Sequence, residues 1–255
     1  MNKQPMQILF DADMVVFRAT SACEREITWY PDFSTLHCDH NEAKTIVDDT
    51  VARITEKVLR HYSYEGNYEI IMCFSDDTNF RKKILPTYKL NRMGKRKPLG
   101  YLGVKQWVSE NYTCYQRQSL EADDCIGILA TLKGTKSVII SGDKDFKSIP
   151  GSFYNLISDT FVETSQEEAD YNHLYQTLVG DTADNYKGCP GLGAVGAKKL
   201  LDQSATWGTV VSAFEKKGLT ESEALIQARV ARILRAEDYD FKAKKPILWT
   251  PKCHI

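Results

Sequence analysis

The sequence predicts an α/β fold with a mostly parallel central sheet flanked by helices. Short apolar runs with strand character alternate with amphipathic stretches of helical spacing, a pattern typical of parallel sheets with crossover helices. Each apolar run is followed at once by carboxylates. In parallel sheets ligands bind beyond the carboxyl ends of the strands, so the same pattern predicts where a functional site lies.

Three apolar runs carry this prediction. Met6–Phe10 leads into Asp11, Glu69–Phe74 into Asp76 and Asp77, and Lys136–Ile140 into Asp143 and Asp145. A single aspartate after a strand is more simply explained as a helix cap or turn residue. For the whole set we expect convergence on one cleft, because the carboxyl ends of parallel strands lie at one edge of the sheet.

Helical spacing of apolar residues is found in four further stretches. The predicted helices lie at Asn41–Tyr62, Tyr171–Val179, Val210–Phe214 and Ala224–Leu234. Residues 20–40 fit a loop or a hairpin, and Phe241–Ile255 is expected to be irregular. The segment from His37 to His40 has no second ligand pair, so we interpret it as surface rather than as a metal site.

The composition sets the broad class of protein. A chain of 255 residues with 42% hydrophobic residues can form one large domain, or one domain with an appendage. No apolar run reaches membrane-spanning length, and the N-terminus lacks a signal-peptide pattern. Seven scattered cysteines without a C-x-x-C pair argue against a disulfide framework or a cysteine zinc site. We therefore expect a cytoplasmic protein.

The acids are densest in Ser119–Asp145, where Glu121, Asp123 and Asp124 precede the third strand. On a helix Glu121 and Asp124 share a face, because they are three residues apart. Hard oxygen ligands without neighbouring His or Cys favour Mg²⁺ or Mn²⁺ over zinc.

The stretch Thr78–Ser109 contains no Asp or Glu and has nine cationic side chains. Tyr88 lies between them in the sequence. The cations are Arg81, Lys82, Lys83, Lys89, Arg92, Lys95, Arg96, Lys97 and Lys105. A solvated basic loop is the simpler alternative. Because this stretch begins directly after Asp76 and Asp77, we favour a nucleic-acid guide.

Gly191, Gly193 and Gly196 spell G-x-G-x-x-G, which in other contexts indicates dinucleotide binding. That fingerprint must follow a strand, and here it follows an acidic turn and Cys-Pro, so we reject it. The favoured interpretation is a tight turn that opens a helix onto a nucleic-acid phosphate, with Lys198 and Lys199 nearby.

Together the motifs resemble those of the 5′-nuclease family, which includes flap endonucleases, the nuclease domain of bacterial DNA polymerase I and bacteriophage 5′→3′ exonucleases. The podovirus-type exonucleases look nearest. The resemblance covers about residues 6–202. It rests on ILFDAD, FSDDTNFRKKILPTYKLNR, LEADD, SGDKD and VGDTADNYKGCPGLGAVGAKK, in the family's order. It implies a PIN-like nuclease core, a helical arch or clamp and a helix–three-turn–helix.

The resemblance implies two metal clusters and a set of basic residues. The first cluster would be Asp11, Asp76, Glu121, Asp123 and Asp124, and the second Asp143, Asp145, Asp181 and Asp184. Catalytic cations at the foot of the arch would be Arg81, Lys89 and Arg92. DNA contacts would come from Lys82, Lys83, Tyr88, Lys95, Arg96, Lys97, Gly191, Gly193, Gly196, Lys198 and Lys199. Whether Asp76 or Asp77 is the ligand stays open, with Asp76 favoured, and Asp13 is an outer-sphere or structural residue.

The resulting hypothesis is a Mg²⁺- or Mn²⁺-dependent 5′→3′ exonuclease with two ions, acting on duplex DNA from a 5′ end or nick. RNA·DNA hybrids are a further candidate substrate, and K⁺ a further candidate ion at the helix–three-turn–helix. The alternatives are a structure-specific flap endonuclease and, from another class, a non-catalytic DNA-binding protein. We expect a monomer with no membrane contact, acting in a host cytoplasm if phage-encoded. The expected division is a core at 1–165, with the arch at about 78–109, and a helical region at 166–255, with the helix–three-turn–helix at about 180–202.

Overall fold

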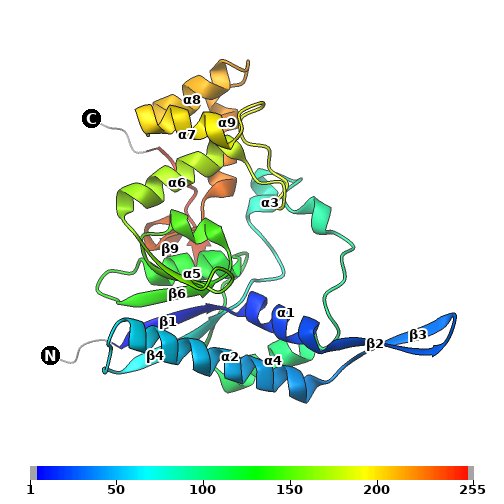
Figure 1. Ribbon diagram of the computed structural model, residues 1–255. Helices are drawn as coiled ribbons and strands as arrows, with labels where there is room; N and C mark the ends of the chain where they lie inside the picture. The colour runs from blue at the N-terminus through cyan, green and yellow to red at the C-terminus, as the bar shows by residue number, and fades with distance from the viewer. Residues whose placement is uncertain (1–4, 252–255) are drawn as a thin grey trace.

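The computed structural model describes residues 5–251 and is built around a six-stranded sheet (Figure 1). The strand order is β5-β4-β1-β6-β7-β8, and only β8 runs antiparallel to its neighbour. The strands are β1 (Met6–Asp11), β4 (Tyr68–Cys73), β5 (Cys114–Tyr115), β6 (Ser137–Ser141), β7 (Gly151–Asn155) and β8 (Thr160–Thr164). The predicted parallel sheet is confirmed. Because β1 lies between β4 and β6, the three acid-bearing strand ends are neighbours.

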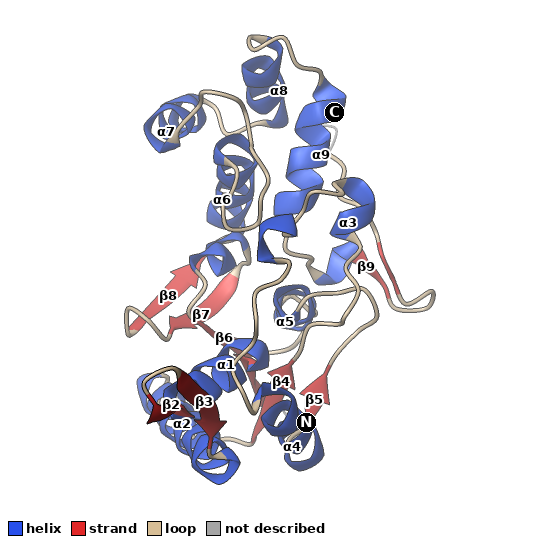
Figure 2. Ribbon diagram, turned by 90° about the vertical axis from the view of Figure 1, so that its right-hand side faces the viewer, coloured by secondary structure: helices blue, strands red, loops and turns tan. Residues whose placement is uncertain are grey.

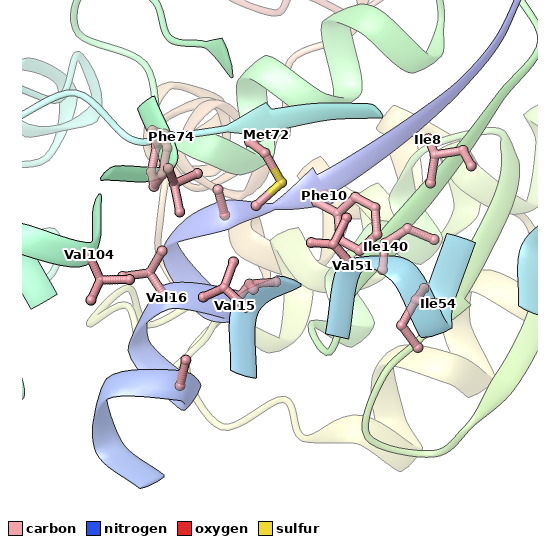
Figure 3. Close-up of a cluster of buried hydrophobic side chains, with 14 of the residues drawn as sticks. Ile8, Phe10, Val15, Val16, Val51, Ile54, Met72, Phe74, Val104 and Ile140 are labelled. Atoms are coloured by element: carbon pink, nitrogen blue, oxygen red, sulfur yellow. The ribbon is translucent and has the colours of Figure 1, made fainter. Parts of the chain in front are cut away.

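The larger core covers one face of the sheet. Side chains alternate along a strand, so Ile8 and Phe10 of β1 point to this face, where Val51 lies beside Phe10 and Val104 lies beside Val16 (Figure 3). The covering helices are α1 (Ala12–Cys23), α2 (His40–His61) and α4 (Tyr101–Asn111). Asp39 caps α2 by accepting N–H bonds from Asn41 and Glu42, so the segment from His37 to His40 ends a strand and begins a helix.

The opposite face is covered by α5 (Ala122–Ala130) and by the returning C-terminal segment. Leu9 of β1 packs there with Ile126 of α5 and with Ile233 and Leu234, which follow the last helix. In the tail that was expected to be irregular, the short strand β10 (Lys245–Pro246) pairs with β9 (Tyr239–Asp240), which lies just before it. The predicted helical region therefore shares a core with the sheet along this segment.

Four helices form a layer beyond the carboxyl edge of the sheet (Figure 2). They are α6 (Gln166–Val179), α7 (Ala194–Gln203), α8 (Trp207–Glu215) and α9 (Glu221–Ala231). They pack on a core of their own that includes Leu178, Leu201 and Phe214. The glycine-rich stretch lies in the loop between α6 and α7, after a helix and not after a strand, so the rejection of a dinucleotide fingerprint is supported.

The basic stretch forms a strap and not a helical arch. After α3 (Arg81–Ile84), residues 85–100, here called the strap, contain one short 3₁₀ helix, Leu90–Arg92, and otherwise turns and irregular backbone. The strap runs from the helical layer to the end of α1 (Figure 1). Pro86, Gly94, Pro98 and Gly100 explain the missing helix, because proline and glycine disfavour helix interiors.

Residues 20–40 include a β-hairpin of β2 (Glu24–Tyr30) and β3 (Phe33–Cys38), which projects from the end of α1 (Figure 1). The hairpin is held at its base, where Arg25 forms an ion pair with Glu42 of α2. This settles the choice between loop and hairpin.

Candidate active site

A cavity of about 250 Å³ lies where the sheet meets the helical layer. Its lining includes seven acids, three cations and the phenols of Tyr88 and Tyr186. The acids are Asp11, Asp13, Glu121, Asp123, Asp143, Asp145 and Asp184, and the cations are Arg81, Lys89 and Arg92. The acids that follow β1 and β6 converge here as expected, whereas those that follow β4, Asp76 and Asp77, are not in the lining.

Local chain geometry aims the strand-end acids at this cavity. Asp11 caps α1 through the N–H of Met14 (3.1 Å), and its second oxygen accepts a hydrogen bond from the Ser141 hydroxyl (2.9 Å). Asp143 accepts the N–H of Asp145 (2.9 Å) and so caps the 3₁₀ helix that follows β6. These aspartates are therefore caps and cavity residues at the same time, because a helix that begins at the strand end turns its first residues toward the cavity.

The start of α5 sends its acids in two directions. Glu121 and Asp123 line the cavity, whereas Asp124 is fully buried and bound by Arg81 in a two-pronged ion pair (2.6 and 2.7 Å). Asp124 also accepts the N–H of Leu234 (3.1 Å). Carboxylate oxygens of Glu121, Asp123 and Asp124 lie within 4.8 Å of one another.

The expected catalytic role of Arg81 is corrected by its contacts. Arg81 is 1% exposed, and its five donors are all used: by Glu121, by both oxygens of Asp124, and by the carbonyls of Val230 and Arg232. No donor remains for a phosphate. Arg81 fastens the end of α9 to the acids of α5.

Asp76 lies apart from the cavity. Its carboxylate accepts hydrogen bonds from the Thr78 hydroxyl (2.6 Å) and from the Ser119 N–H (2.8 Å), which lower its pKa. The cavity lining includes neither Asp76 nor Asp77. In this structure Asp76 braces the turn after β4 against the segment before α5.

The loop between α6 and α7 brings in the acids from beyond the sheet. Gly180 and Gly188 have φ angles of +72° and +63°, and a Cβ on either would lie within 2.4 Å of backbone atoms of the opposite strand of the loop. This glycine contact closes the loop that carries Asp181 and Asp184. Asp184 reaches the acidic cavity, whereas Asp181 lines an adjoining cavity of about 760 Å³ together with Asp145.

Lys89 and Arg92 of the strap make ion pairs inside the cavity. Lys89 pairs with Glu121 and lies 3.4 Å from Asp184, which also pairs with Arg92. Lys89 adopts a left-handed conformation (φ +53°), and its N–H donates to the Asp184 carbonyl (2.8 Å). Two cations predicted to act on substrate are thus held against acids predicted to bind metal.

Tyr88 is not available for DNA binding, contrary to the prediction. It is 2% exposed, and its hydroxyl lies 2.9 Å from a carboxylate oxygen of Glu121 and 2.9 Å from one of Asp184. The phenol therefore links an acid of the sheet domain to one of the helical layer.

Burial and mutual repulsion raise the pKa values of several of these acids. Burial is the main cause that raises the pKa of Asp11 to about 6, and burial with Asp143 and Asp181 raises that of Asp145 to about 7. Burial and the neighbouring acids also raise the pKa of Asp123. Burial would do the same to Glu121, but Lys89 and Arg81 hold its pKa at about 2. The cavity therefore concentrates hard oxygen donors whose ionised forms need a cation, as a divalent metal site does.

The other predicted DNA contacts lie outside the cavity lining. Lys82, Lys83, Lys95 and Lys97 are exposed, whereas Arg96 is paired with Glu24 (2.7 Å) at the base of the hairpin. Gly193 precedes the first residue of α7, with Gly191 in the turn before it and Gly196 in the first helical turn. Lys198 and Lys199 are exposed on α7.

Sequence reasoning missed two tyrosines, Tyr101 and Tyr186, that position the acids. The Tyr101 hydroxyl donates to one oxygen of Asp13 (2.6 Å), and the Ser75 N–H donates to the other (2.8 Å). Tyr186 is buried against the cavity and pairs through its backbone with Asp181. A tyrosine in a helix or turn gives no sequence signal for such a role, because the contact joins segments far apart in the chain.

Comparison with known proteins gives one family match and several relatives. Residues 6–176 match the family described as 5′-3′ exonuclease, N-terminal resolvase-like domain. The chain is 32% identical to the exodeoxyribonuclease of Enterobacteria phage T3, over 96% of this chain and 93% of that protein. It is 31% identical to the exonuclease of Escherichia phage T7, with the same coverage. A bacteriophage T5 flap endonuclease structure, solved with DNA and metal ions, has 14% identity and a TM-score of 0.63 and covers 90% of this chain and 89% of that one, a likeness of fold.

Proposed function

This chain belongs to the 5′-3′ exonuclease family, and we propose that it is a metal-dependent 5′→3′ exodeoxyribonuclease whose active site is the acid-lined cavity. The observation that carries the assignment is the meeting of seven acids with the strap cations at the carboxyl ends of three parallel strands. Within the part of the chain that the structure describes, no helix is long and apolar enough to cross a membrane.

We propose that Mg²⁺ or Mn²⁺ is the metal and that two ions bind. Asp11, Glu121 and Asp123 would hold one, and Asp143, Asp145 and Asp184 the other, because these acids already face the cavity. Three further acids would hold the surroundings of the metal ligands in place. Asp124 does so through its ion pair with Arg81, Asp76 through the turn after β4, and Asp181 from the adjoining cavity. Bound metal would activate water and stabilise charge on the phosphate.

The remaining groups act on the substrate or hold the acids in place. Lys89 and Arg92 lie where a scissile phosphate would approach the acids, so their charge would stabilise the phosphate as negative charge develops. Tyr88 and Tyr101 hold acids through their hydroxyls. No side chain is needed as a nucleophile.

We propose double-stranded DNA with a 5′ end or nick as the substrate. The N-terminus of α7 and exposed Lys198 and Lys199 would grip the duplex backbone without reading sequence, with K⁺ as a candidate ion in the turn before α7. RNA in RNA·DNA hybrids would be cut by the same chemistry. One chain supplies the whole cavity, so we expect a monomer, which the phage relatives would place in an infected host's cytoplasm.

Flap endonuclease activity is the second candidate, favoured by the likeness to the T5 structure. Length of product separates the two: an exonuclease releases mononucleotides, and a flap endonuclease releases the intact flap.

The deciding experiment is digestion of 5′-labelled blunt, nicked and flapped duplexes with Mg²⁺ or with EDTA. We expect cutting from 5′ ends with Mg²⁺ alone. Asp143→Asn should lose at least about a hundredfold in rate, because Asp143 faces the cavity and neutralising it removes a ligand charge. Asp240→Asn, on the remote β9, is the matched control and should keep full activity. Cutting that persists in EDTA would refute the metal mechanism.

A further inference from the structure

The β2–β3 hairpin carries a group of large apolar side chains that the proposed chemistry does not use. Trp29, Tyr30 and Phe33 at its tip are 59%, 71% and 54% exposed, and Ile27 and Leu36 are exposed below them. The tip is ordered by side chains: the Trp29 indole N–H donates to Thr35 (2.9 Å), and the Thr28 and Ser34 hydroxyls lie 3.1 Å apart. Exposed aromatics on a braced hairpin indicate a contact surface rather than core.

Two structural routes connect this surface with the acidic cavity. The first is α1, which begins at the cavity with Asp13 and Met14 and presents Phe17 and Arg18 to solvent before it leads into the hairpin. Residues four apart on a helix share a face, so Phe17 and Arg18 lie on the same side of α1 as the cavity residues Asp13 and Met14.

The second route is the strap. The strap contributes Lys89 to the cavity lining and then reaches the hairpin base, where Glu24 binds Arg96 through both carboxylate oxygens and accepts the Leu99 N–H (2.6 Å). Exposed Lys95 and Lys97 flank this junction. Hydrogen bonds from Arg96 and Leu99 lower the pKa of Glu24 to about 2, so Glu24 stays ionised and paired with Arg96 well into the acid range.

We propose that the hairpin tip binds the unpaired nucleotides of the DNA substrate, by stacking bases on Trp29, Tyr30 and Phe33. The inference rests on the proposed nuclease function and adds a subsite to it. A single strand that leaves the cavity along α1 would meet cations first and aromatic rings next, the combination that binds single strands without sequence preference. A fully paired end presents no free base faces and gains nothing from the rings.

The test is DNA binding measured by fluorescence anisotropy in EDTA, so that no strand is cut. The probes are a blunt duplex and the same duplex with a short unpaired 5′ thymidine tail. We expect the double variant Trp29→Ala/Tyr30→Ala to bind the tailed duplex at least about thirtyfold more weakly, because it loses two of the rings on which bases would stack. Binding of the blunt duplex should be unchanged.

Two further variants separate stacking from loss of structure. Trp29→Phe keeps an aromatic face and should retain most of the affinity for the tailed duplex. Tyr68→Ala removes an exposed ring (46%) at the start of β4, at the amino end of the sheet, and should change the binding of neither probe. Equal losses on both probes, or no loss on the tailed one, would overturn the proposal.

Digestion of the blunt duplex with Mg²⁺ keeps this result apart from the nuclease assignment. The double variant should cut it at the wild-type rate. If the wild-type protein itself does not cut, the proposed function fails, whatever the hairpin binds.

Discussion

At the scale of single residues, the site is built from acids whose charge is balanced in different ways. Asp124 is neutralised by Arg81, and Glu121 by Lys89 and Arg81. Asp11, Asp123 and Asp145 instead have raised pKa values. The protein thus pairs some acids with its own cations. Among the residues that the structure describes, the other acids have no such partner, and a bound metal ion would supply the missing positive charge. Two predictions follow from these pairings.

Arg81→Met should destabilise the fold. The change leaves Asp124 fully buried without its ion-pair partner, which costs about 3–5 kcal/mol. Urea unfolding of the metal-free protein measures this loss in the free energy of unfolding. Lys82→Met, a similar change at the next, exposed position of α3, should stay within about 0.5 kcal/mol of wild type. A loss below about 1 kcal/mol for Arg81→Met would show that the ion pair contributes little beyond its own desolvation.

Lys89→Met should tighten metal binding in the absence of DNA. The Lys89 ammonium pairs with Glu121, and a divalent ion at that carboxylate must compete with it and be repelled by it. We expect at least about tenfold higher affinity for Mn²⁺ by titration calorimetry, together with slower cutting. Lys95→Met is the control, because Lys95 is exposed on the same strap. Unchanged or weaker Mn²⁺ binding would contradict this prediction, because it would mean that Lys89 leaves Glu121 without a cost in free energy when the metal binds.

At the scale of elements, the loops between regular segments place the site. The α6–α7 loop delivers Asp184 through the contact of Gly180 with Gly188, and the strap delivers Lys89 and Arg92. Helix α7 faces outward from the same loop, with exposed lysines and no side-chain cap on its first turn. One loop therefore links the cavity with the proposed grip on the duplex.

Replacing Lys198 and Lys199 together by alanine should weaken duplex binding uniformly across sequences. If each lysine neutralises one phosphate, the slope of log K against log salt should become shallower by about 2, because each contact contributes about 0.9. Anisotropy titrations at several salt concentrations measure the slope. Lys242→Ala/Lys244→Ala, a pair in the remote tail, should leave it unchanged. An unaltered slope in the α7 variant would remove this helix from the DNA interface.

At the scale of the whole molecule, the cavity couples pH, metal and stability. Asp145, with a pKa of about 7, and Asp123, with a raised pKa, bind more protons in the folded than in the unfolded state near neutrality. The stability of the metal-free protein should therefore fall as pH rises from about 6.5 to about 8. Burial lowers the pKa of His173 to about 3, so below about pH 6.5 the unfolded chain binds a proton at this residue that the folded protein does not. His173 therefore makes the fold less stable as pH falls, but only below about pH 6.5.

Thermal unfolding at several pH values checks this coupling. In EDTA, Tm should decrease between about pH 6.5 and about pH 8, and saturating Mg²⁺ should reduce or reverse the decrease, because metal binds the deprotonated acids. Apparent metal affinity should rise over the same interval. A Tm in EDTA that rises with pH would contradict the raised pKa values.

The sequence by itself determined the parallel sheet and the acids at its carboxyl edge. Strand and helix periodicity are local, and the ends of adjacent parallel strands must lie together, so Asp11 and Asp143 could be brought to one cavity from pattern alone. The glycine-rich turn before α7 was identified from its glycines, and Gly191 there adopts a positive φ of +71°.

Only the tertiary structure decided which charged residues face the cavity and which are used inside the protein. Asp123 and Asp124 are adjacent in sequence, yet one lines the cavity and the other is buried on Arg81. Arg81 and Lys89 lie on one basic stretch and both border the cavity, yet all the donors of Arg81 are used by the acids of α5 and by the end of α9, whereas Lys89 reaches Glu121 and Asp184 from the strap. Periodicity gives the direction of a side chain within its own element. Its partner comes from a segment far away in the chain, so the role of each charge was fixed only when those segments packed together.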